Sequence, residues 1–269
     1  MAIRKLFVTD LDGTFLRYDH HYDRVALQEI LKQFKEKGYL FVAASGRSLL
    51  SLKKLFQGLE EDMAFLAENG SLLSYQGQMI FEDKPITSHV YLPLIEAIKM
   101  GPFSSTNQIL LSAKSGAYVL NEVEENYFKH IEGYYPNLSR VEDFSNITEE
   151  IIKLVVTFPE EDLDAANRWL NEHFEGISSV TTGFDSVDII MSDIHKAVAL
   201  SKLCDHFGLS HQDVIAFGDN QNDKEMLEFA GTAVATENAR DSIKAIADQV
   251  IGPCQDDAVI KYIQDYLKK

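Results

Sequence analysis

Short apolar runs alternate with helical patterns over the first 82 residues of the chain. The runs at residues 5–10 and 40–45 have the length of buried strands, and each is followed by apolar residues at helical spacing. These helical patterns consist of Leu27, Ile30, Leu31 and Phe34 before Gly38, and of Leu49, Leu52 and Phe56. A third run at 64–67 precedes a hairpin over 71–82 with its turn at Gln76-Gly77. This alternation predicts a parallel sheet with helical connections.

The pattern changes after residue 82, where regular alternation stops. We expect a helix over 92–100, two strands flanking 114–116, a helix over 122–131, a strand over 152–158, a helix over 162–174, and strands over 178–182 and 186–191. Alternation then resumes with a helix over 195–207, a strand over 214–218, a helix over 223–230, a strand over 232–235, and a final helix with Ile260, Ile263 and Leu267. The middle of the chain therefore differs from both ends in its predicted pattern of helices and strands.

The outer segments together predict one α/β domain. We expect a Rossmann-like parallel sheet with helices on both faces, formed discontinuously by residues 1–82 and 188–269. Residues 83–187 are expected to form an inserted α+β domain. Three small domains in series are the less favoured alternative, because the first 82 residues supply too few strands to cover both faces of a sheet.

The charge of the chain narrows the possible partners. Among 269 residues, 25 are Lys or Arg and 42 are Asp or Glu, which gives a formal net charge of −17. Binding to nucleic acid or to an anionic membrane requires clustered basic residues, so we expect neither partner. The cysteines Cys204 and Cys254 suggest no disulfide framework, and we expect no signal peptide and no membrane span. These features predict a cytoplasmic protein, while the oligomeric state cannot be read from them.

Polar residues follow several of the predicted strands of the sheet, where ligands bind in open α/β folds. They lie in three segments, Asp10-Leu11-Asp12-Gly13-Thr14, Ser45-Gly46-Arg47 and Gly218-Asp219-Asn220-Gln221-Asn222-Asp223. Lys196 opens the helix that follows the insert. Carboxylates that converge on one crevice repel each other unless a cation lies among them, and oxygen ligands favour Mg²⁺.

Each segment taken alone also has a purely structural interpretation. Residues 10–14 could form a plain turn, Ser45 could cap a helix, and Lys196 could be a solvated helix residue. A calcium loop of the EF-hand type is excluded, because it would need Gly at position 15 or 224, where Phe15 and Lys224 stand. The joint order and placement of the segments at one sheet edge favour a functional site.

With these motifs, the chain resembles the haloacid-dehalogenase-like (HAD) phosphohydrolases, and within them the Cof-type subfamily with an α/β cap domain inserted between the second and third motifs. The resemblance also covers Glu68-Asn69-Gly70 and the tail from Ala230-Gly231 to Asp248. It implies hydrolysis of phosphate monoesters of small metabolites, such as sugar phosphates, through an aspartyl-phosphate intermediate with Mg²⁺ as cofactor. Residues 83–187 would be the cap.

The resemblance also implies roles for individual residues. Asp10 would be the nucleophile and Asp12 the general acid and base, while Lys196 would balance the charge of Asp10 and the phosphoryl group. Phosphate would be bound by Leu11, Ser45, Gly46, Arg47, Lys196 and Asn222. The metal would be held by the Asp10 carboxylate, the Asp12 backbone carbonyl and Asp219, with Asp223 as a direct or supporting ligand.

One departure from the family pattern lies in the third motif. It commonly reads Lys-Gly and here reads Lys196-Ala197, preceded by His195, for which a surface or helix-capping role is expected. Other functions remain open at this point: a phosphomutase of the same superfamily, or a non-catalytic regulatory module that binds Mg²⁺ and phosphate. A dinucleotide oxidoreductase is disfavoured, because the chain contains neither GxGxxG nor GxxxxGK[ST].

Overall fold

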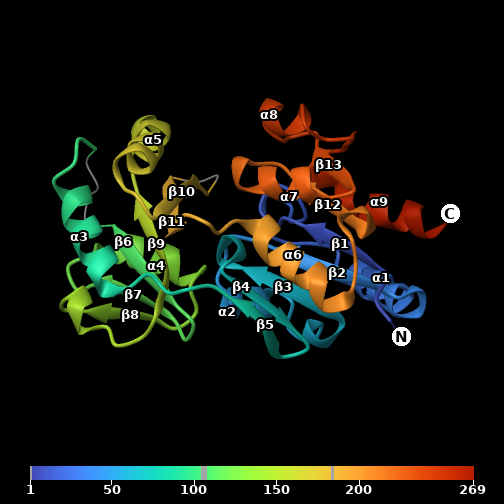
Figure 1. Cartoon of the computed structure of the whole chain (residues 1–269), viewed down its shortest axis with the longest axis horizontal. Helices are drawn as coiled ribbons and strands as arrows, with labels where there is room; N and C mark the ends of the chain where they lie inside the picture. The colour runs from blue at the N-terminus through green and yellow to red at the C-terminus, as the bar shows by residue number, and fades with distance from the viewer. Residues whose placement is uncertain (1, 104–107, 183–184) are drawn as a thin grey trace. The chain divides into compact units, whose positions relative to one another are not determined.

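The chain folds into two compact units, each with its own sheet (Figure 1). The structure, a computed structural model, describes residues 2–103, 108–182 and 185–269. The first unit comprises Met1–Ser45, Phe56–Glu82 and His195–Lys269, and the second comprises Gly46–Leu55 and Asp83–Ile194. Both sheets carry helices, so the predicted α/β class is confirmed.

The first unit is built on an eight-stranded sheet with the order β14-β13-β12-β1-β2-β3-β4-β5. Strands β14 to β3 are parallel, and β4 and β5 extend the sheet as an antiparallel hairpin. The bounds are β1 Lys5–Thr9, β2 Tyr39–Ala44, β3 Met63–Ala67, β4 Leu72–Tyr75, β5 Gln78–Glu82, β12 Val214–Gly218, β13 Thr232–Thr236 and β14 Gln249–Ile251. Because β12, β1, β2 and β3 are parallel neighbours, their carboxyl ends lie at one sheet edge.

Alternating residues of these strands bury opposite faces of the first sheet. On one face, Leu6 and Val8 of β1 belong to a core with Leu200 of α6 and Met226 of α7. On the other face, the Phe7 ring packs against aromatic residues of α1, β2 and α9, namely Phe34, Tyr39 and Tyr266. The helices are α1 Arg24–Lys37, α6 Lys196–Phe207, α7 Lys224–Phe229, α8 Asp241–Lys244 and α9 Ala258–Leu267. Both faces are therefore covered, as predicted.

The second unit contains a six-stranded sheet with the order β10-β11-β9-β6-β7-β8. Its strands pair antiparallel except for the parallel pair β7 and β8. The bounds are β6 Ile109–Ala113, β7 Ala117–Leu120, β8 Leu138–Val141, β9 Ile151–Thr157, β10 Ile177–Thr181 and β11 Ser186–Met191. Its helices are α2 Leu49–Leu55, α3 Ser88–Lys99, α4 Glu125–Glu132 and α5 Leu163–His173.

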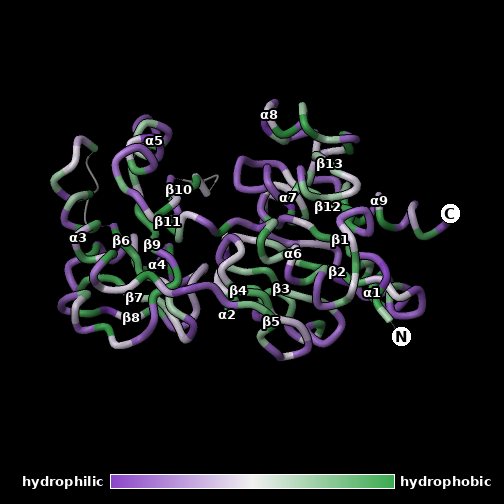
Figure 2. The backbone as a smooth tube through the Cα atoms, in the orientation of Figure 1, coloured by the Kyte–Doolittle hydropathy of each residue, from purple (hydrophilic) through white to green (hydrophobic). Residues whose placement is uncertain are grey.

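The two faces of the second sheet also have separate cores. Ile95 of α3 and Leu170 of α5 share one core with Leu154 of β9. Tyr127 of α4 lies in the other core with Val155, the next residue of β9. Figure 2 shows hydrophobic colour along β3, β4 and β9 and mostly polar colour along α5. In the part of the chain that the structure describes, no helix has both the length and the apolar composition that a membrane span requires.

Most elements expected from the sequence are present, with several corrections. Helix α3 begins at Ser88, a turn before the predicted start, so that Pro93 lies inside it. Strands β8 and β14 and helix α8 were not predicted, because all three are short and both strands lie at sheet edges. The expected insert boundary at residue 187 was wrong, because it cuts through β11, which pairs with β9 and β10. That the inserted unit acts as a cap stays a prediction.

Gly70 fixes the approach of the turn after β3 to the start of α6. Its φ is +109°, and a Cβ at this position would lie 2.5 Å from the His195 carbonyl oxygen and 3.1 Å from the Lys196 nitrogen. Gly77 in the hairpin turn has φ +73°, and no atom of the described residues lies within 4 Å of its Cβ position. At Gly70, both the positive φ and the close approach of α6 therefore favour glycine. At Gly77, the positive φ alone does so.

We expect Gly70→Ala to lower the melting temperature clearly more than Gly77→Ala does. The Gly77 variant carries only the cost of a left-handed alanine, roughly 1–2 kcal/mol, while the Gly70 variant must also push the start of α6 away. Thermal unfolding followed by circular dichroism measures both losses. Equal losses in the two variants would show that the close approach at Gly70 is not a constraint.

Candidate active site

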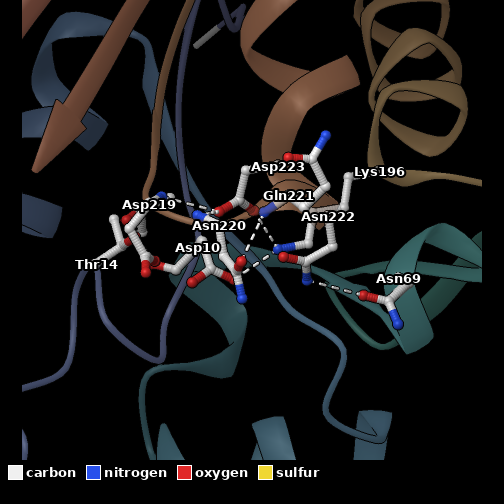
Figure 3. Close-up of polar contacts among 10 residues, drawn as sticks. Asp10, Thr14, Asn69, Lys196, Asp219, Asn220, Gln221, Asn222 and Asp223 are labelled. Atoms are coloured by element: carbon white, nitrogen blue, oxygen red, sulfur yellow. Dashed lines mark hydrogen bonds and ion pairs between the residues drawn. The ribbon is translucent and has the colours of Figure 1, made fainter. Parts of the chain in front are cut away.

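The site begins where β1 and its neighbour β12 end. The two strands are paired in parallel through Thr9 and Phe217, and the Asp10 amide donates to the Phe217 carbonyl at 2.9 Å. Asp10 directly follows β1, and Asp219 directly follows β12. The register of two strands therefore brings these two carboxylates to the same edge, as the sequence predicted (Figure 3).

Lys196 extends toward the carboxylates from one side and contacts two of them (Figure 3). It is the first residue of α6, and its Nζ donates to Asp10 Oδ1 and to Asp223 Oδ1 at 2.6 Å each. The Lys196 and Asp223 side chains are 0% exposed. Burial lowers the pKa of Lys196, but attraction by the two carboxylates outweighs burial and raises the pKa above its usual value. Lys196 is therefore a permanently protonated cation in this site.

Burial and mutual repulsion disfavour ionisation of the carboxylates. Burial and the charge of Asp223 raise the pKa of Asp10 well above its usual value, although Lys196 acts in the opposite direction. Burial and the charge of Asp223 also raise the pKa of Asp219 to about 7, and a hydrogen bond from Thr14 Oγ1 at 2.6 Å opposes this shift. Three carboxyl groups thus lie around one cation, and their mutual repulsion favours protonation where no further cation is bound.

The carboxylates fit a divalent cation. Asp10, Asp219 and Asp223 each place a carboxylate oxygen within 4.8 Å of the others. Oxygen donors of this kind suit Mg²⁺. Asp223 has a further structural duty, because its Oδ2 accepts hydrogen bonds from the Asp219 and Asn220 amides at 3.0 and 3.1 Å. The donor set and its charge therefore agree with the predicted metal, and both Asp223 oxygens already accept hydrogen bonds from protein groups.

Asp12 and Leu11 lie in the tight loop that follows Asp10. The carbonyl of buried Leu11 accepts hydrogen bonds from three successive amides, those of Thr14, Phe15 and Leu16, at 2.8 to 3.2 Å. The Asp12 side chain is not among the three clustered carboxylates, and its Oδ1 lies 3.2 Å from Nδ1 of His20. The Asp12 side chain is 20% exposed. The two aspartates of this loop thus lie in different environments.

Ser45 and Asn222 are placed around the same sheet edge. Ser45 is buried directly after β2, and its amide donates to the Leu66 carbonyl at 2.9 Å. Asn222 Nδ2 donates to Oδ1 of Asn69 at 3.2 Å (Figure 3). The Asn69 amide in turn donates to the Ser45 carbonyl at 3.1 Å. Asn69 therefore connects the end of β2 with the turn after β12.

Gly46 and Arg47 follow Ser45 in the chain and belong to the second unit. Within that unit, Lys153 Nζ donates to the Gly46 carbonyl. The Arg47 guanidinium lies over the Tyr134 ring, with 5.5 Å between its Cζ and the ring centroid. Both predicted phosphate-binding residues are thus held by side chains of their own unit.

His195 occupies the N-cap position of α6 through its backbone. In the described part of the chain, its side chain makes no capping hydrogen bond, and its Nδ1 is buried without a hydrogen-bond partner. His195 therefore caps the helix through its backbone and not through its side chain, and the residue is half-buried with its Nδ1 covered.

Three residues at the site were not assigned roles from the sequence, namely Thr14, Asn69 and His20. Thr14 and Asn69 lie in motifs that follow β1 and β3, so their position after a strand was a usable signal. His20 had no local signal, because its contact with Asp12 depends on the folding of the loop between them.

Comparisons with known proteins agree with this geometry. The profile of a family described as haloacid dehalogenase-like hydrolase matches residues 7–263. The chain is 31% identical over 265 residues to 5-amino-6-(5-phospho-D-ribitylamino)uracil phosphatase YbjI of Escherichia coli strain K12, with 98% of this chain and 96% of the relative covered. It is 26% identical over 275 residues to HMP-PP phosphatase of Serratia proteamaculans strain 568, with 98% and 96% covered.

A solved structure is similar over almost the whole chain. The crystal structure of SMU.1108c from Streptococcus mutans UA159 superposes with a TM-score of 0.91 at 29% sequence identity, and the match covers 98% of this chain and 99% of that chain. The fold, the strand-end motifs and the profile match therefore lead to one assignment. The chain belongs to the haloacid dehalogenase-like hydrolase family, as its motifs predicted.

Proposed function

We propose that the chain is a Mg²⁺-dependent phosphatase that hydrolyses phosphate monoesters of small metabolites through an aspartyl-phosphate intermediate. The observation that carries this proposal is the buried Lys196 ammonium at 2.6 Å from both Asp10 and Asp223, with Asp219 beside them. A nucleophilic carboxylate and an anionic phosphoryl group repel each other, and a fixed cation offsets this repulsion without reorganisation.

Asp10 is the proposed nucleophile. In the first step an Asp10 oxygen forms a bond to phosphorus while the bond from phosphorus to the ester oxygen breaks. Lys196 keeps the Asp10 carboxylate in place and balances its charge. Water then attacks the aspartyl phosphate, which releases inorganic phosphate and restores Asp10. Splitting hydrolysis into two displacements is a common solution for a slow reaction.

Asp12 is the proposed general acid and base. It would give its proton to the departing ester oxygen and later take a proton from the attacking water. The surroundings of Asp12 and Asp10 support different roles as acid and base and as nucleophile. Asp12 is partly exposed, whereas Asp10 is buried beside Lys196. A nearby cation favours the ionised form of a carboxyl group, so a carboxyl group without one takes up a proton more readily.

The phosphate and the metal would use the remaining residues at the strand ends. Asp10, Asp219 and the Asp12 backbone carbonyl would hold Mg²⁺, with Asp223 supporting them. A bound Mg²⁺ would supply positive charge that keeps the carboxylates ionised and offsets the charge of the phosphoryl group. Phosphate would be bound by Ser45, the Leu11 and Gly46 amides, Arg47, Lys196 and Asn222.

The inserted unit is proposed to be the cap domain that sets substrate specificity. The substrate is proposed to be a phosphate ester of a sugar or a related polar metabolite. This agrees with the activity in the name of the relative at 31% identity, whose substrate is 5-amino-6-(5-phospho-D-ribitylamino)uracil. A cytoplasmic location is proposed because Cys204 and Cys254 are free, buried thiols, as is usual in a reducing compartment.

A screen of phosphorylated metabolites with Mg²⁺ tests the phosphatase, and 5-amino-6-(5-phospho-D-ribitylamino)uracil is its first candidate. We expect inorganic phosphate to accumulate in step with the dephosphorylated product. An isomeric sugar phosphate without free phosphate would contradict the proposal and identify a phosphomutase. Binding of phosphate esters with no turnover of any ester would identify a non-catalytic module.

Asp10→Asn is expected to lower phosphate release by a factor on the order of 10³ or more. The amide oxygen can still accept from Lys196, so the melting temperature should not fall, but the amide cannot attack phosphorus. Asp205→Asn is the control, because Asp205 is exposed on the same helix as Lys196 and should leave the rate unchanged. If the Asp10→Asn variant released phosphate at more than a tenth of the parent's rate, Asp10 would not be the nucleophile.

Asp219→Asn is expected to stabilise the metal-free protein in a pH-dependent way. The Asp219 pKa is about 7 in the folded protein against a usual value of 3.8. Between pH 3.8 and about pH 7, the folded state therefore binds more protons than the unfolded state. The parent protein loses stability as the pH rises through this range. The variant cannot ionise at this position, so its advantage should grow from pH 4 to pH 7 and stay constant above.

Thermal unfolding in EDTA between pH 5 and pH 8 measures this difference, and a shift of a few degrees is expected. Added Mg²⁺ should raise the melting temperature of the parent at pH 8 much more than that of the variant. Asp205→Asn again serves as the control. A pH-independent difference would contradict the raised pKa, and equal stabilisation by Mg²⁺ would contradict Asp219 as a metal ligand.

A further inference from the structure

His20 contacts the proposed general acid from a loop that carries none of the family motifs. Its Nδ1 lies 3.2 Å from Asp12 Oδ1, and the two side chains are 41% and 20% exposed. An unprotonated carboxyl oxygen only accepts hydrogen bonds, so the imidazole donates here through Nδ1–H. This contact fixes one oxygen of Asp12 and thereby the direction of the other.

The backbone of His20 is held in a conformation that favours glycine. Its φ is +60°, in the left-handed region. The His20 amide donates to the Arg17 carbonyl, and the Arg17 amide donates to the His21 carbonyl, both at 2.9 Å. This is the closure of a tight turn whose last position is commonly glycine. A histidine in that position is an outlier of the kind that clusters at functional sites.

The loop is anchored at its other side, so His20 is not simply a residue of a loose turn. The Arg17 guanidinium forms an ion pair with the Asp257 carboxylate. The Tyr18 amide donates to Gln255 Oε1 at 3.1 Å. Both contacts tie the turn to the segment before α9. The imidazole of His20 is therefore presented to Asp12 by a fixed backbone.

The next residue of the same turn provides a natural comparison. The His21 side chain is 79% exposed, and its Nδ1 lies 2.7 Å from the backbone carbonyl of Asp19. Two adjacent histidines thus share a loop, but His20 contacts Asp12 of the segment that follows β1, whereas His21 contacts Asp19 in its own turn.

We infer that His20 is a positioning residue that holds Asp12 in the orientation required for proton transfer to the leaving group. This inference rests on the proposed phosphatase function. With Oδ1 bound to His20, Asp12 Oδ2 carries the proton. In the first step Oδ2–H gives this proton to the ester oxygen, which receives the electron pair of the breaking bond to phosphorus while Asp10 forms its own bond to phosphorus. In the second step Oδ2 takes a proton from the attacking water.

The inference predicts a dependence on the leaving group. An alkoxide is a poor leaving group and needs the proton from Asp12, whereas 4-nitrophenolate departs without it. The ratio kcat/KM reports the steps up to departure of the leaving group and not the later hydrolysis of the aspartyl phosphate. A disoriented Asp12 should therefore lower kcat/KM for alkyl phosphates and spare kcat/KM for 4-nitrophenyl phosphate.

Two substitutions separate positioning from folding. His20→Gly removes the imidazole and suits the left-handed backbone, so its melting temperature should equal or exceed that of the parent. His20→Asn also tolerates this backbone, and its Nδ2 can take the place of the imidazole Nδ1 as donor to Asp12. His21→Asn is the matched control in the same turn.

The experiment compares the full-length parent and the three variants with Mg²⁺, on 4-nitrophenyl phosphate and on the alkyl phosphate that the parent turns over fastest. For His20→Gly we expect kcat/KM on the alkyl ester to fall at least tenfold and kcat/KM on the aryl ester to change less than twofold. His20→Asn should recover most of the loss, and His21→Asn should match the parent.

Three results would overturn the inference: unchanged alkyl activity in His20→Gly, an equal fall on both esters, or an Asn variant as impaired as the Gly variant. Different results would contradict the proposed phosphatase function itself. In that case the parent would release no phosphate from either ester, or Asp10→Asn would retain the parent's activity.

Discussion

The buried ammonium of Lys196 holds two carboxylates that come from distant parts of the chain. Asp10 follows β1, Lys196 begins α6, and Asp223 ends the turn after β12. Removal of the single cation from such a buried group costs about 3–5 kcal/mol, because the carboxylates then lose their compensation. The start of α6 must therefore lie at the carboxyl edge of the sheet. The close packing of Gly70 against His195 holds it there from the other side.

A second set of contacts fixes the loop after β1. Thr14 donates to Asp219, and Asn238 Nδ2 donates to the Gly13 carbonyl at 2.7 Å. The Arg240 amide donates to the Asp219 carbonyl at 2.9 Å. The C-terminal part of the chain thus encloses the nucleophile loop. This enclosure brings carboxylates closer than they would lie in water, and the raised pKa values of Asp10 and Asp219 follow from it.

Backbone strain gathers around the same edge of the sheet. Three non-glycine residues with positive φ, His20, Glu68 and Asn69, lie in the segments that follow β1 and β3. Such conformations persist only where the surroundings determine them. Here the turn at His20 is closed by backbone hydrogen bonds, and Asn69 is bonded to both Ser45 and Asn222. The fold therefore concentrates charge repulsion and strain at the residues that the proposed chemistry uses.

The sequence by itself determined the elements with strong periodicity and the polar residues that end the parallel strands. Buried strands such as β1 and β12 are continuous apolar runs, so the residues after them are visible without a structure. The family could be inferred from those residues, and the profile match confirmed it.

Only the tertiary structure decided the features that depend on contacts between distant segments. The edge strands β8 and β14 are short and half-exposed, so pairing with a neighbour and not composition makes them strands. β11 belongs to the second sheet because it pairs with β9 and β10, which moved the predicted boundary. The contact of His20 with Asp12 needs a closed turn between them. Local sequence carries hydrophobic pattern and motif, whereas strand partners and side-chain contacts are properties of the folded chain.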